Sequence, residues 1–387
     1  MKQVYIIDYI RTPIAKFQGG LSEVRADDLA AIVLKEIVKR NPQIPAEEIE
    51  DVILGCANQA GEDNRNVARM ASLLAELPIK IGGETVNRLC ASGMAAISNA
   101  YRAIAIGEGD FYIAGGVEQM TRAPYVLSKS AQPFGRDVQL FDSSFGWRFV
   151  NPKMKELYGV DGMGETAENL AEIYKISREA QDEFALHSQQ KATSAQNSGR
   201  LAQEIVNVEV PQKKGEPKIF SQDEFVKPDT TLDKLAKLRP AFKKEGGSVT
   251  AGNSSGLNDG AAAMILASED AVKKYNLKPL AKIISSAVVG VEPRIMGIGP
   301  VEATKKALSR ANLSLEDMDI IELNEAFAAQ ALSVLQELGI DAKDERLNPN
   351  GGAIALGHPL GMSGTRIVGT AALELQKKNK KYALCTL

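Results

Sequence analysis

The chain contains little cysteine and almost no histidine. Among 387 residues there are three cysteines and two histidines, and none of them has the spacing of zinc ligands. This usage argues against both a disulfide framework and a metal site. It is typical of a protein of a reducing compartment, which we expect to be the cytoplasm.

An excess of one charge and long apolar runs are also lacking. The formal net charge is −3, which provides no basic field for nucleic acid. No apolar run approaches the ~20 residues needed to cross a bilayer. The N-terminus is a short predicted strand, residues 1–8, that leads at once into the turn Arg11-Thr12-Pro13, unlike a signal peptide. We therefore expect neither nucleic-acid nor membrane partners, and the length indicates two or three domains.

One cysteine stands out by its position. Residues 84–89 read as a strand and residues 91–107 as a helix, and Cys90 lies at their junction. Unpaired N–H groups and the positive end of the helix dipole stabilise a thiolate there. Three small residues follow and leave the approach to the sulfur open. Cys90 is therefore a candidate nucleophile, although on position alone a buried structural cysteine fits equally well.

The two histidines lie in very different surroundings. His358 lies in residues 350–364, which contain five glycines and one proline, and such turns let the backbone approach a ligand closely. His187 lies in the amphipathic helical stretch 181–190, where a structural role is expected. His358 is thus the candidate base for a thiol nucleophile.

A polar pair follows an apolar strand near the C-terminus. The predicted strand 320–323 ends in Asn324 and Glu325 and passes into a helix. Ligand chemistry in open α/β sheets is placed at the carboxyl ends of strands. Asn324 is therefore a third candidate for the site.

These segments together resemble the thiolase family, and the resemblance covers essentially the whole chain. It implies an α/β thiolase fold with duplicated βαβαβ halves in a five-layer αβαβα sandwich and an inserted loop domain. The matching segments, in family order, are Arg11-Thr12-Pro13, 86–93, 115–120, 250–256, 324–328 and 351–359.

The resemblance implies an acyltransferase that cleaves a 3-oxoacyl-CoA with CoA, or runs the reverse Claisen condensation. Coenzyme A is then a co-substrate, and no bound cofactor is expected. By motif, Cys90 carries the acyl group as a thioester, and its N–H contributes to one oxyanion hole. His358 activates Cys90 and, with a water held by Asn324, forms the other hole. Fixed donors of this kind typically supply a few kcal/mol each.

The resemblance also implies substrate-binding positions and a preference among substrates. Gly162 stands where acetoacetyl-specific thiolases usually carry histidine. Residues 55–66 and 141–152 resemble the degradative branch that cleaves 3-oxoadipyl-CoA, and Arg148 could pair with a distal carboxylate. Acetoacetyl-CoA formation by an acetyl-CoA acetyltransferase is the alternative. The implied substrate- and CoA-binding residues are Gly162, Met163, Lys227, Ser255, Met296, Ala326 and Phe327.

One family feature has no counterpart in the chain. Thiolases use a second cysteine as acid/base in a Cys-x-Gly segment of the last strand. Here Cys385 comes three residues too early, no glycine-rich segment follows it, and it is expected to be a buried strand residue. We therefore expect the last strand of the C-terminal half to be missing. A truncated CoA-binding homologue with impaired catalysis stays open as an alternative.

The expected domains are an N-terminal half and a C-terminal half separated by an insertion. The N-terminal half spans 1–120 and is completed by about 248–270, the CoA-binding loop domain spans 121–247 with a helix at about 165–198, and the C-terminal half spans 271–387. The stretch after Met120 resembles a tetramerisation loop, so a homo-oligomer, dimer or tetramer, is expected. A condensing enzyme of the fatty-acid-synthase type shares the fold and the Cys-His-Asn set, and is a further alternative.

The two halves resemble each other in sequence. Residues 44–54 can be laid over residues 313–323, since in each an acidic segment precedes an apolar strand. Cys90 with its helix can be laid over the glycine loop and the helix that starts near Gly361. This is the pattern of duplicated α/β units.

Overall fold

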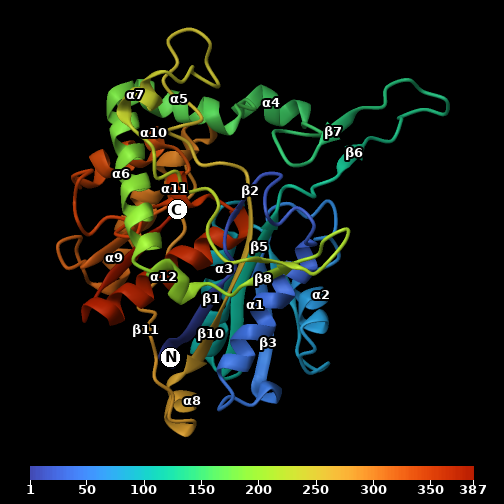
Figure 1. The fold of residues 1–387 in the computed structure, drawn as a ribbon, viewed down its shortest axis with the longest axis vertical. Helices are drawn as coiled ribbons and strands as arrows, with labels where there is room; N and C mark the ends of the chain where they lie inside the picture. The colour runs from blue at the N-terminus through green and yellow to red at the C-terminus, as the bar shows by residue number, and fades with distance from the viewer.

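The computed structural model describes residues 1–387, and its N-terminal half is built on a seven-stranded sheet (Figure 1). The strand order is β11-β1-β10-β5-β3-β4, and β2 pairs with the start of β10. β3 is parallel to β4 and β5, whereas β10 is antiparallel to both β5 and β1. The strands are β1 (Val4–Arg11), β2 (Ala15–Lys16), β3 (Ile49–Gly55), β4 (Glu84–Val86), β5 (Phe111–Gln119), β10 (Asn258–Ser268) and β11 (Ala281–Lys282).

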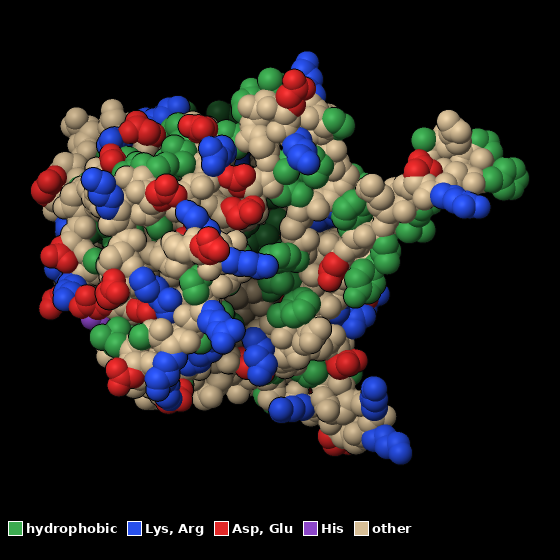
Figure 2. Space-filling view, turned by 90° about the horizontal axis from the view of Figure 1, so that it is seen from above, with side chains coloured by type: hydrophobic (Ala, Val, Ile, Leu, Met, Phe, Trp, Pro, Cys, Tyr) green, Lys and Arg blue, Asp and Glu red, His purple; other side chains and the backbone are tan.

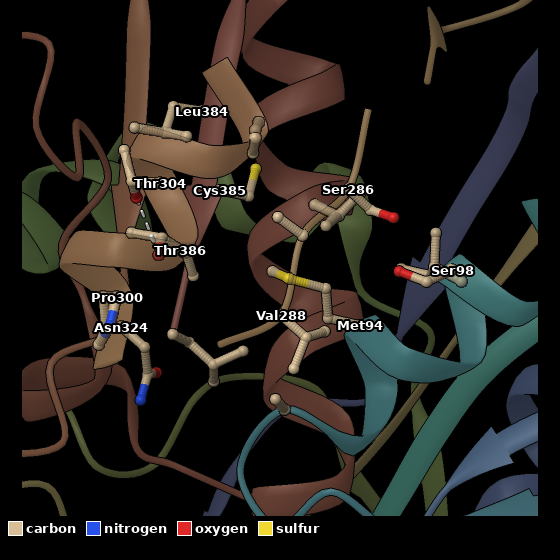
Figure 3. Close-up of a pocket in the computed structure, with 18 of the residues that line it drawn as sticks. Met94, Ser98, Ser286, Val288, Pro300, Thr304, Asn324, Leu384, Cys385 and Thr386 are labelled. Atoms are coloured by element: carbon tan, nitrogen blue, oxygen red, sulfur yellow. Dashed lines mark hydrogen bonds between the residues drawn. The ribbon is translucent and has the colours of Figure 1, made fainter. Parts of the chain in front are cut away.

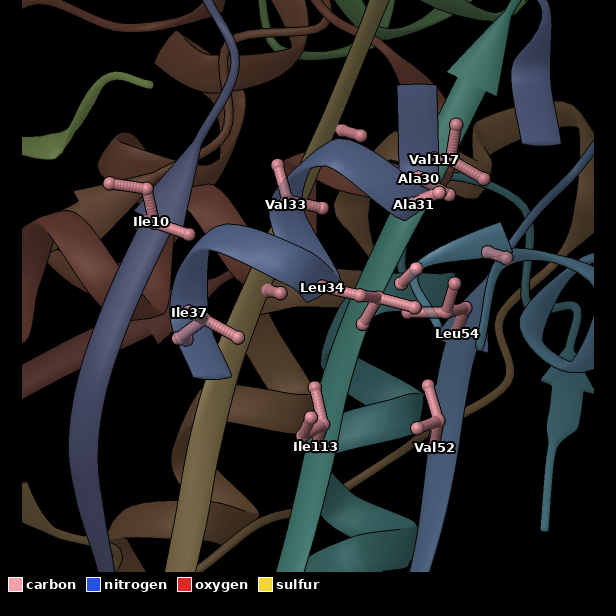
Figure 4. Packing of buried hydrophobic residues seen from close by; sticks show 14 of the residues in the cluster. Ile10, Ala30, Ala31, Val33, Leu34, Ile37, Val52, Leu54, Ile113 and Val117 are labelled. Atoms are coloured by element: carbon pink, nitrogen blue, oxygen red, sulfur yellow. The ribbon is translucent and has the colours of Figure 1, made fainter. Parts of the chain in front are cut away.

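Both faces of this sheet are covered by helices. All residues of β5 and β10 are buried, and such nearly continuous apolar runs are typical of strands packed on both sides. Successive side chains of β10 alternate between two cores, so Ala263 and Ile265 face one helix layer and Met264 and Leu266 the other. Figure 4 shows the first core, where α1 (Ala26–Arg40) packs on the sheet beside α2 (Val67–Leu74).

The middle layer consists of α3 (Ser92–Ile106) and α12 (Leu360–Lys378), which pack against each other and against β5. On the far side of α12 lies the second sheet, in which β12 (Ile320–Leu323) is parallel to β13 (Ala383–Thr386). Ile320 packs toward α12, whereas Ile321 and Leu323 pack toward α9 (Gly299–Ala311) and α10 (Ala328–Leu338). The expected five-layer αβαβα arrangement is thus present.

The second sheet is less complete than the first. β13 pairs only with β12, and its other edge faces a cavity of about 900 Å³ lined mainly by apolar residues. Residues 284–291 form the opposite wall and make no backbone–backbone hydrogen bond. The close-up in Figure 3 shows Leu384 and Cys385 on one side of this space and Ser286 and Val288 on the other. We call this space the strand groove.

The insertion between the halves carries a projecting hairpin and several helices. β6 (Tyr125–Leu127) and β7 (Leu140–Asp142) form the hairpin, which extends away from the body (Figure 1). The expected single helix at 165–198 is wrong, because Lys175 has a left-handed φ of 55° and Ser177 caps a new helix. The insertion comprises β6, β7, α4 (Pro152–Tyr158), α5 (Met163–Ile173), α6 (Arg178–Asn197), β8 (Val208–Val210), β9 (Lys218–Phe220) and α7 (Leu232–Ala236).

The remaining segments are short and include α8 (Glu269–Lys274) and α11 (Ala353–Leu356). The predicted strand at 84–89 ends earlier, at Val86, because the chain turns before Cys90. No helix has both the length and the apolar character needed to span a bilayer.

Candidate active site

Cys90 lies in a tight turn just before α3. Leu89 has a left-handed φ of 49°, an uncommon conformation for a branched residue. The Ser92 hydroxyl stabilises the turn, since it accepts from Arg88 N at 2.8 Å and donates to Leu89 O at 2.6 Å. The backbone N–H of Cys90 makes no hydrogen bond within the protein. It therefore has a free donor beside the sulfur, as an oxyanion hole requires.

The expectation that the helix N-terminus stabilises a thiolate at Cys90 needs correction. Burial raises the pKa of the Cys90 thiol to about 12, and the nearby charge of Glu118 adds to this effect. The desolvation of the charged form outweighs the helix dipole. Cys90 rests as a neutral thiol, so the site needs a base to activate it.

His358 is buried, with 5% of its surface exposed, and is held at three points. Its backbone N–H donates to Asn258 Oδ1 at 2.9 Å, and its Nδ1 lies 2.6 Å from Ser363 Oγ. The Ser363 hydroxyl donates its proton to Pro359 O at 2.9 Å, so it must accept from Nδ1–H. This assigns the tautomer and makes Nε2 the unprotonated ring nitrogen, which can act as a base.

Asn324 meets His358 on the Nε2 side. Its Nδ2 lies 3.4 Å from Nε2, and its backbone N–H donates to Thr386 O at 3.0 Å, which fixes it at the end of β12. The Asn324 Oδ1 is buried without a hydrogen-bond partner. Burial, together with the charge of Arg366, lowers the pKa of His358 to about 3, so the imidazole is neutral at physiological pH.

Glycines bring the start of α3 against the start of α12. A Cβ at Gly93 would lie 2.6 Å from Gly361 O, and a Cβ at Gly364 would lie 2.3 Å from Met94 N. Both distances are shorter than real Cβ contacts, so only glycine permits this approach. Cys90 and His358 each precede one of these facing glycines by three residues, so the two halves present them at one junction.

Most of the predicted binding residues surround the same cavity as Cys90 and Asn324. Ser255 lies beside Ala326, because its Oγ and its N–H both reach Ala326 O at 3.0 Å. Gly162 is not part of the wall but caps the start of α5, where its N–H contacts Glu165. The predicted residues that line the cavity are Cys90, Met163, Met296, Asn324, Ala326 and Phe327.

Three predicted residues lie away from this junction. Lys227 is exposed, with its Nζ 4.8 Å above the ring of Phe225. His187 lies on α6 and is half-buried, and it does not line the cavity. Cys385 lies on β13 as expected but is only half-buried, since its side chain borders the strand groove.

The sequence analysis missed residues that act through His358. Ser363 and Asn258 hold the imidazole, and Arg366 contributes to its low pKa. Ser363 had a signal, since it lies in the same glycine-rich segment and one helical turn past Pro359. Asn258 had none, because it comes from the start of a strand 100 residues earlier. No group of three His, Cys, Asp or Glu side chains has the arrangement of a metal site.

Comparison with known proteins identifies the family. The family model "Thiolase, N-terminal domain" matches residues 4–270, and "Thiolase, C-terminal domain" matches residues 277–387. The chain belongs to the thiolase family. It is accordingly an acyltransferase of the class that cleaves 3-oxoacyl-CoA with CoA.

Characterised relatives match over the full chain. The 3-oxoadipyl-CoA/3-oxo-5,6-dehydrosuberyl-CoA thiolase of Escherichia coli (strain K12) is 58% identical over 387 residues, which is 100% of this chain and 96% of that protein. A beta-ketoadipyl-CoA thiolase of Acinetobacter baylyi is 57% identical with the same coverage. An acetyl-CoA acetyltransferase of Chromobacterium violaceum is 48% identical over 386 residues, again covering 100% of this chain and 96% of that protein.

Solved thiolase structures share the fold. The Bacillus anthracis acetyl-CoA acetyltransferase superposes with a TM-score of 0.92 at 42% identity, covering 100% of this chain and 96% of that one. Human mitochondrial 3-ketoacyl-CoA thiolase, solved in complex with CoA, gives 0.89 at 41% identity and covers 100% and 95%. The expected thiolase fold and class are therefore confirmed, and the relatives give no support to a fatty-acid-synthase-type condensing enzyme.

Proposed function

We propose that this thiolase works in the degradative direction on 3-oxoacyl-CoA substrates whose acyl chain ends in a second carboxylate, with 3-oxoadipyl-CoA as the preferred substrate. The observation that carries the proposal is the 56–58% identity, over the whole chain, to several thiolases named for that substrate. Identity to the acetyl-CoA acetyltransferase relative is 48%.

The catalytic steps follow from the resting states of the two side chains. His358 Nε2 takes the proton of the neutral Cys90 thiol, and the sulfur attacks the 3-oxo carbon of the substrate. The bond between C2 and C3 then breaks, the shortened acyl group stays on Cys90 as a thioester, and acetyl-CoA leaves once its C2 has gained a proton. The thiol of a second CoA then takes the acyl group. The free N–H of Cys90 and the His358–Asn324 pair supply donors for the developing oxyanions.

The proton for C2 requires a second acid, and the strand groove suggests where it belongs. In the N-terminal half, β10 lies antiparallel between β5 and β1. In the C-terminal half, β12 and β13 correspond to β3 and β5, and residues 284–291 correspond to β1. The groove has the place of β10. One further antiparallel strand fits there, and a Cys-x-Gly segment leading into it from β13 would carry the acid/base cysteine to the side of Asn324.

The substrate preference rests on Gly162 and Arg148. Gly162 does not line the cavity, but it directly precedes Met163, which does, so a histidine in its place would add bulk at the edge of the acyl pocket. Arg148 donates only to Ser143 O, at 3.2 Å, and has no carboxylate partner, so its guanidinium can pair with a distal carboxylate. For CoA itself, Ser255 borders the pantetheine path and exposed Lys227 lies toward the nucleotide.

Steady-state cleavage of two substrates tests the proposal. We expect a higher kcat/KM with 3-oxoadipyl-CoA than with acetoacetyl-CoA, and we expect Arg148→Ala to lower only the former. Arg136→Ala, which changes another arginine of the same insertion, is the matched control. A preference for acetoacetyl-CoA that Arg148→Ala leaves unchanged would favour the acetyl-CoA acetyltransferase alternative.

The assembly is proposed to be a homotetramer formed through the projecting hairpin. Its tip exposes large apolar side chains, among them Phe134, Leu127 and Leu140, as the green atoms on the arm in Figure 2 indicate. Apolar surface of this size on a thin arm is typical of an interaction site. Light scattering that reports a 41.6 kDa monomer at micromolar concentration would refute the assembly.

A further inference from the structure

Glu118 is a buried carboxylate without a cationic partner. It lies near the end of β5, has 0% of its surface exposed, and forms no ion pair. Burying a charge in this way costs several kcal/mol unless other groups compensate. A buried glutamate near the end of an apolar strand therefore destabilises the fold unless other groups solvate its charge.

The compensation comes from three backbone N–H groups of two separate segments. Oε1 accepts from Asn58 N at 2.9 Å, whereas Oε2 accepts from Ala57 N at 3.1 Å and from Gly361 N at 2.8 Å. Ala57 and Asn58 belong to the loop after β3, and Gly361 belongs to the first turn of α12. One carboxylate thus joins that loop to the start of a helix, where a negative charge is favourable.

Each of these segments leads to a catalytic side chain. Gly361 lies three residues after His358 in the same glycine-rich turn. Ala57 O accepts from Asn87 Nδ2 at 3.0 Å, and Asn87 Oδ1 accepts from Leu89 N at 2.9 Å, next to Cys90. β5 and the start of α12 are in close backbone contact, since a Cβ at Gly116 would lie 1.8 Å from Gly361 O.

We propose that Glu118 is a positioning residue that holds the Cys90 turn and the His358 loop in register, and that it does so only as a carboxylate. Both of its oxygens face N–H donors, so a proton or an amide NH₂ on either one replaces an acceptor with a donor and breaks a bond. The inference rests on the proposed roles of Cys90 and His358 and extends them to the group that joins them.

The charge of Glu118 also acts on the Cys90 thiol. This effect disfavours the thiolate, whereas the positioning effect favours the reaction. The charge raises the pKa of Cys90, so its removal should make the thiol easier to ionise even while it loosens the site. Burial raises the pKa of Glu118 itself to about 7. The titratable groups that interact with it are Asp63 and Cys56 from the loop after β3, and Cys90; Asp259 pairs with Gln119, so its side chain lies on the other face of the sheet. The first turn of α12 contributes none.

Two readouts on Glu118→Gln test the inference. In Glu118→Gln, acylation of Cys90 by acetyl-CoA, measured by intact mass, should be at least about tenfold slower at saturating acetyl-CoA. The acetyl-CoA concentration that gives half the maximal rate should change little. Alkylation of Cys90 by iodoacetamide at pH 8.5 should instead be several-fold faster. Glu118→Asp keeps the charge but is one methylene shorter, so acylation should fall while alkylation stays at the wild-type rate.

Matched controls separate positioning from general damage. Glu168→Gln removes another buried carboxylate, which accepts from Ser248 N and Val249 N in a different part of the chain, and it should leave both rates unchanged. Wild-type acylation should decline as the pH falls through about 7, since Glu118 then gains its proton. This decline should persist in Asp259→Asn and be absent in Glu118→Gln.

The outcomes are decisive in each case. The inference would be overturned if Glu118→Gln acylated Cys90 at the wild-type rate, or if Glu168→Gln lowered the acylation rate as much as Glu118→Gln does. If Glu118→Gln does not fold, Glu118→Asp and the pH profile decide instead, and a flat profile between pH 6 and 8 would overturn it. A wild-type protein whose Cys90 is alkylated but never acylated would refute the proposed function, while the alkylation rates would still report on Glu118.

Discussion

The two halves of the molecule differ in what lies beside β5 and beside β13. In the first half, β10 fills the space between β5 and β1, and every one of its residues is buried. In the second half, the corresponding space between β13 and residues 284–291 is the strand groove. The first half supplies the nucleophile, and the second supplies the base and Asn324. Capture of the acyl group therefore depends on residues of both halves, which meet where α3 packs against α12.

The strongest test of this division is removal of the nucleophile. Cys90→Ala should abolish acylation by acyl-CoA and labelling by equimolar iodoacetamide, measured by intact mass. Cys56 should not substitute for it, because its side chain has 0% of its surface exposed, whereas Cys90 lines the cavity. Cys56→Ala is the control and should keep full labelling. Labelling that persists at Cys56 or Cys385 in Cys90→Ala would contradict the assignment.

The next effect concerns the base from the second half. His358→Ala should slow acylation on the order of 10²-fold or more, because Cys90 rests as a neutral thiol and loses its proton acceptor. His187→Ala should leave acylation nearly unchanged, since that side chain lies on α6 outside the cavity. Equal losses in the two variants would remove the distinction between them.

A third experiment completes the second half. A version of the chain with a family-like Cys-x-Gly strand after Leu387 should acylate Cys90 at the original rate but turn over on the order of tenfold faster or more, as expected for gaining an acid/base group. The same strand with serine in place of the new cysteine should fill the groove and raise the melting temperature without that gain. Full steady-state thiolysis by a verified 387-residue chain would show that the second cysteine is dispensable.

Much of the site could be predicted because its signals are local. Cys90 and His358 lie in short glycine-containing segments, where small residues let other groups come close. These segments made both residues candidates, and the resemblance to the thiolase family supplied their expected roles. The roles of the three expected catalytic residues stay predictions, but the structure places them at one junction between α3 and α12.

What could not be predicted depends on packing across long distances. The raised pKa of Cys90 reflects desolvation and the charge of Glu118 on another strand, so the strand–helix junction alone gave the wrong sign. The tautomer of His358 depends on the Ser363 hydroxyl, whose proton goes to Pro359 O only once α12 has formed. The break between α5 and α6 lies at Lys175, a residue with no evident turn signal.

The smallest expected effect is a difference in stability between two core substitutions, Ile113→Ala on β5 and Leu384→Ala on β13 beside the groove. Ile113 on β5 is fully buried within a large core, so Ile113→Ala should cost about 2–5 kcal/mol of unfolding free energy. Leu384 on β13 is also buried, but it belongs to a smaller core of 16 residues and borders the groove (Figure 3). Leu384→Ala should therefore cost only about 1–2 kcal/mol in urea unfolding. Once a strand fills the groove, the Leu384→Ala cost should rise toward that of Ile113→Ala, whereas equal costs before and after would show that the groove is not the place of a missing strand.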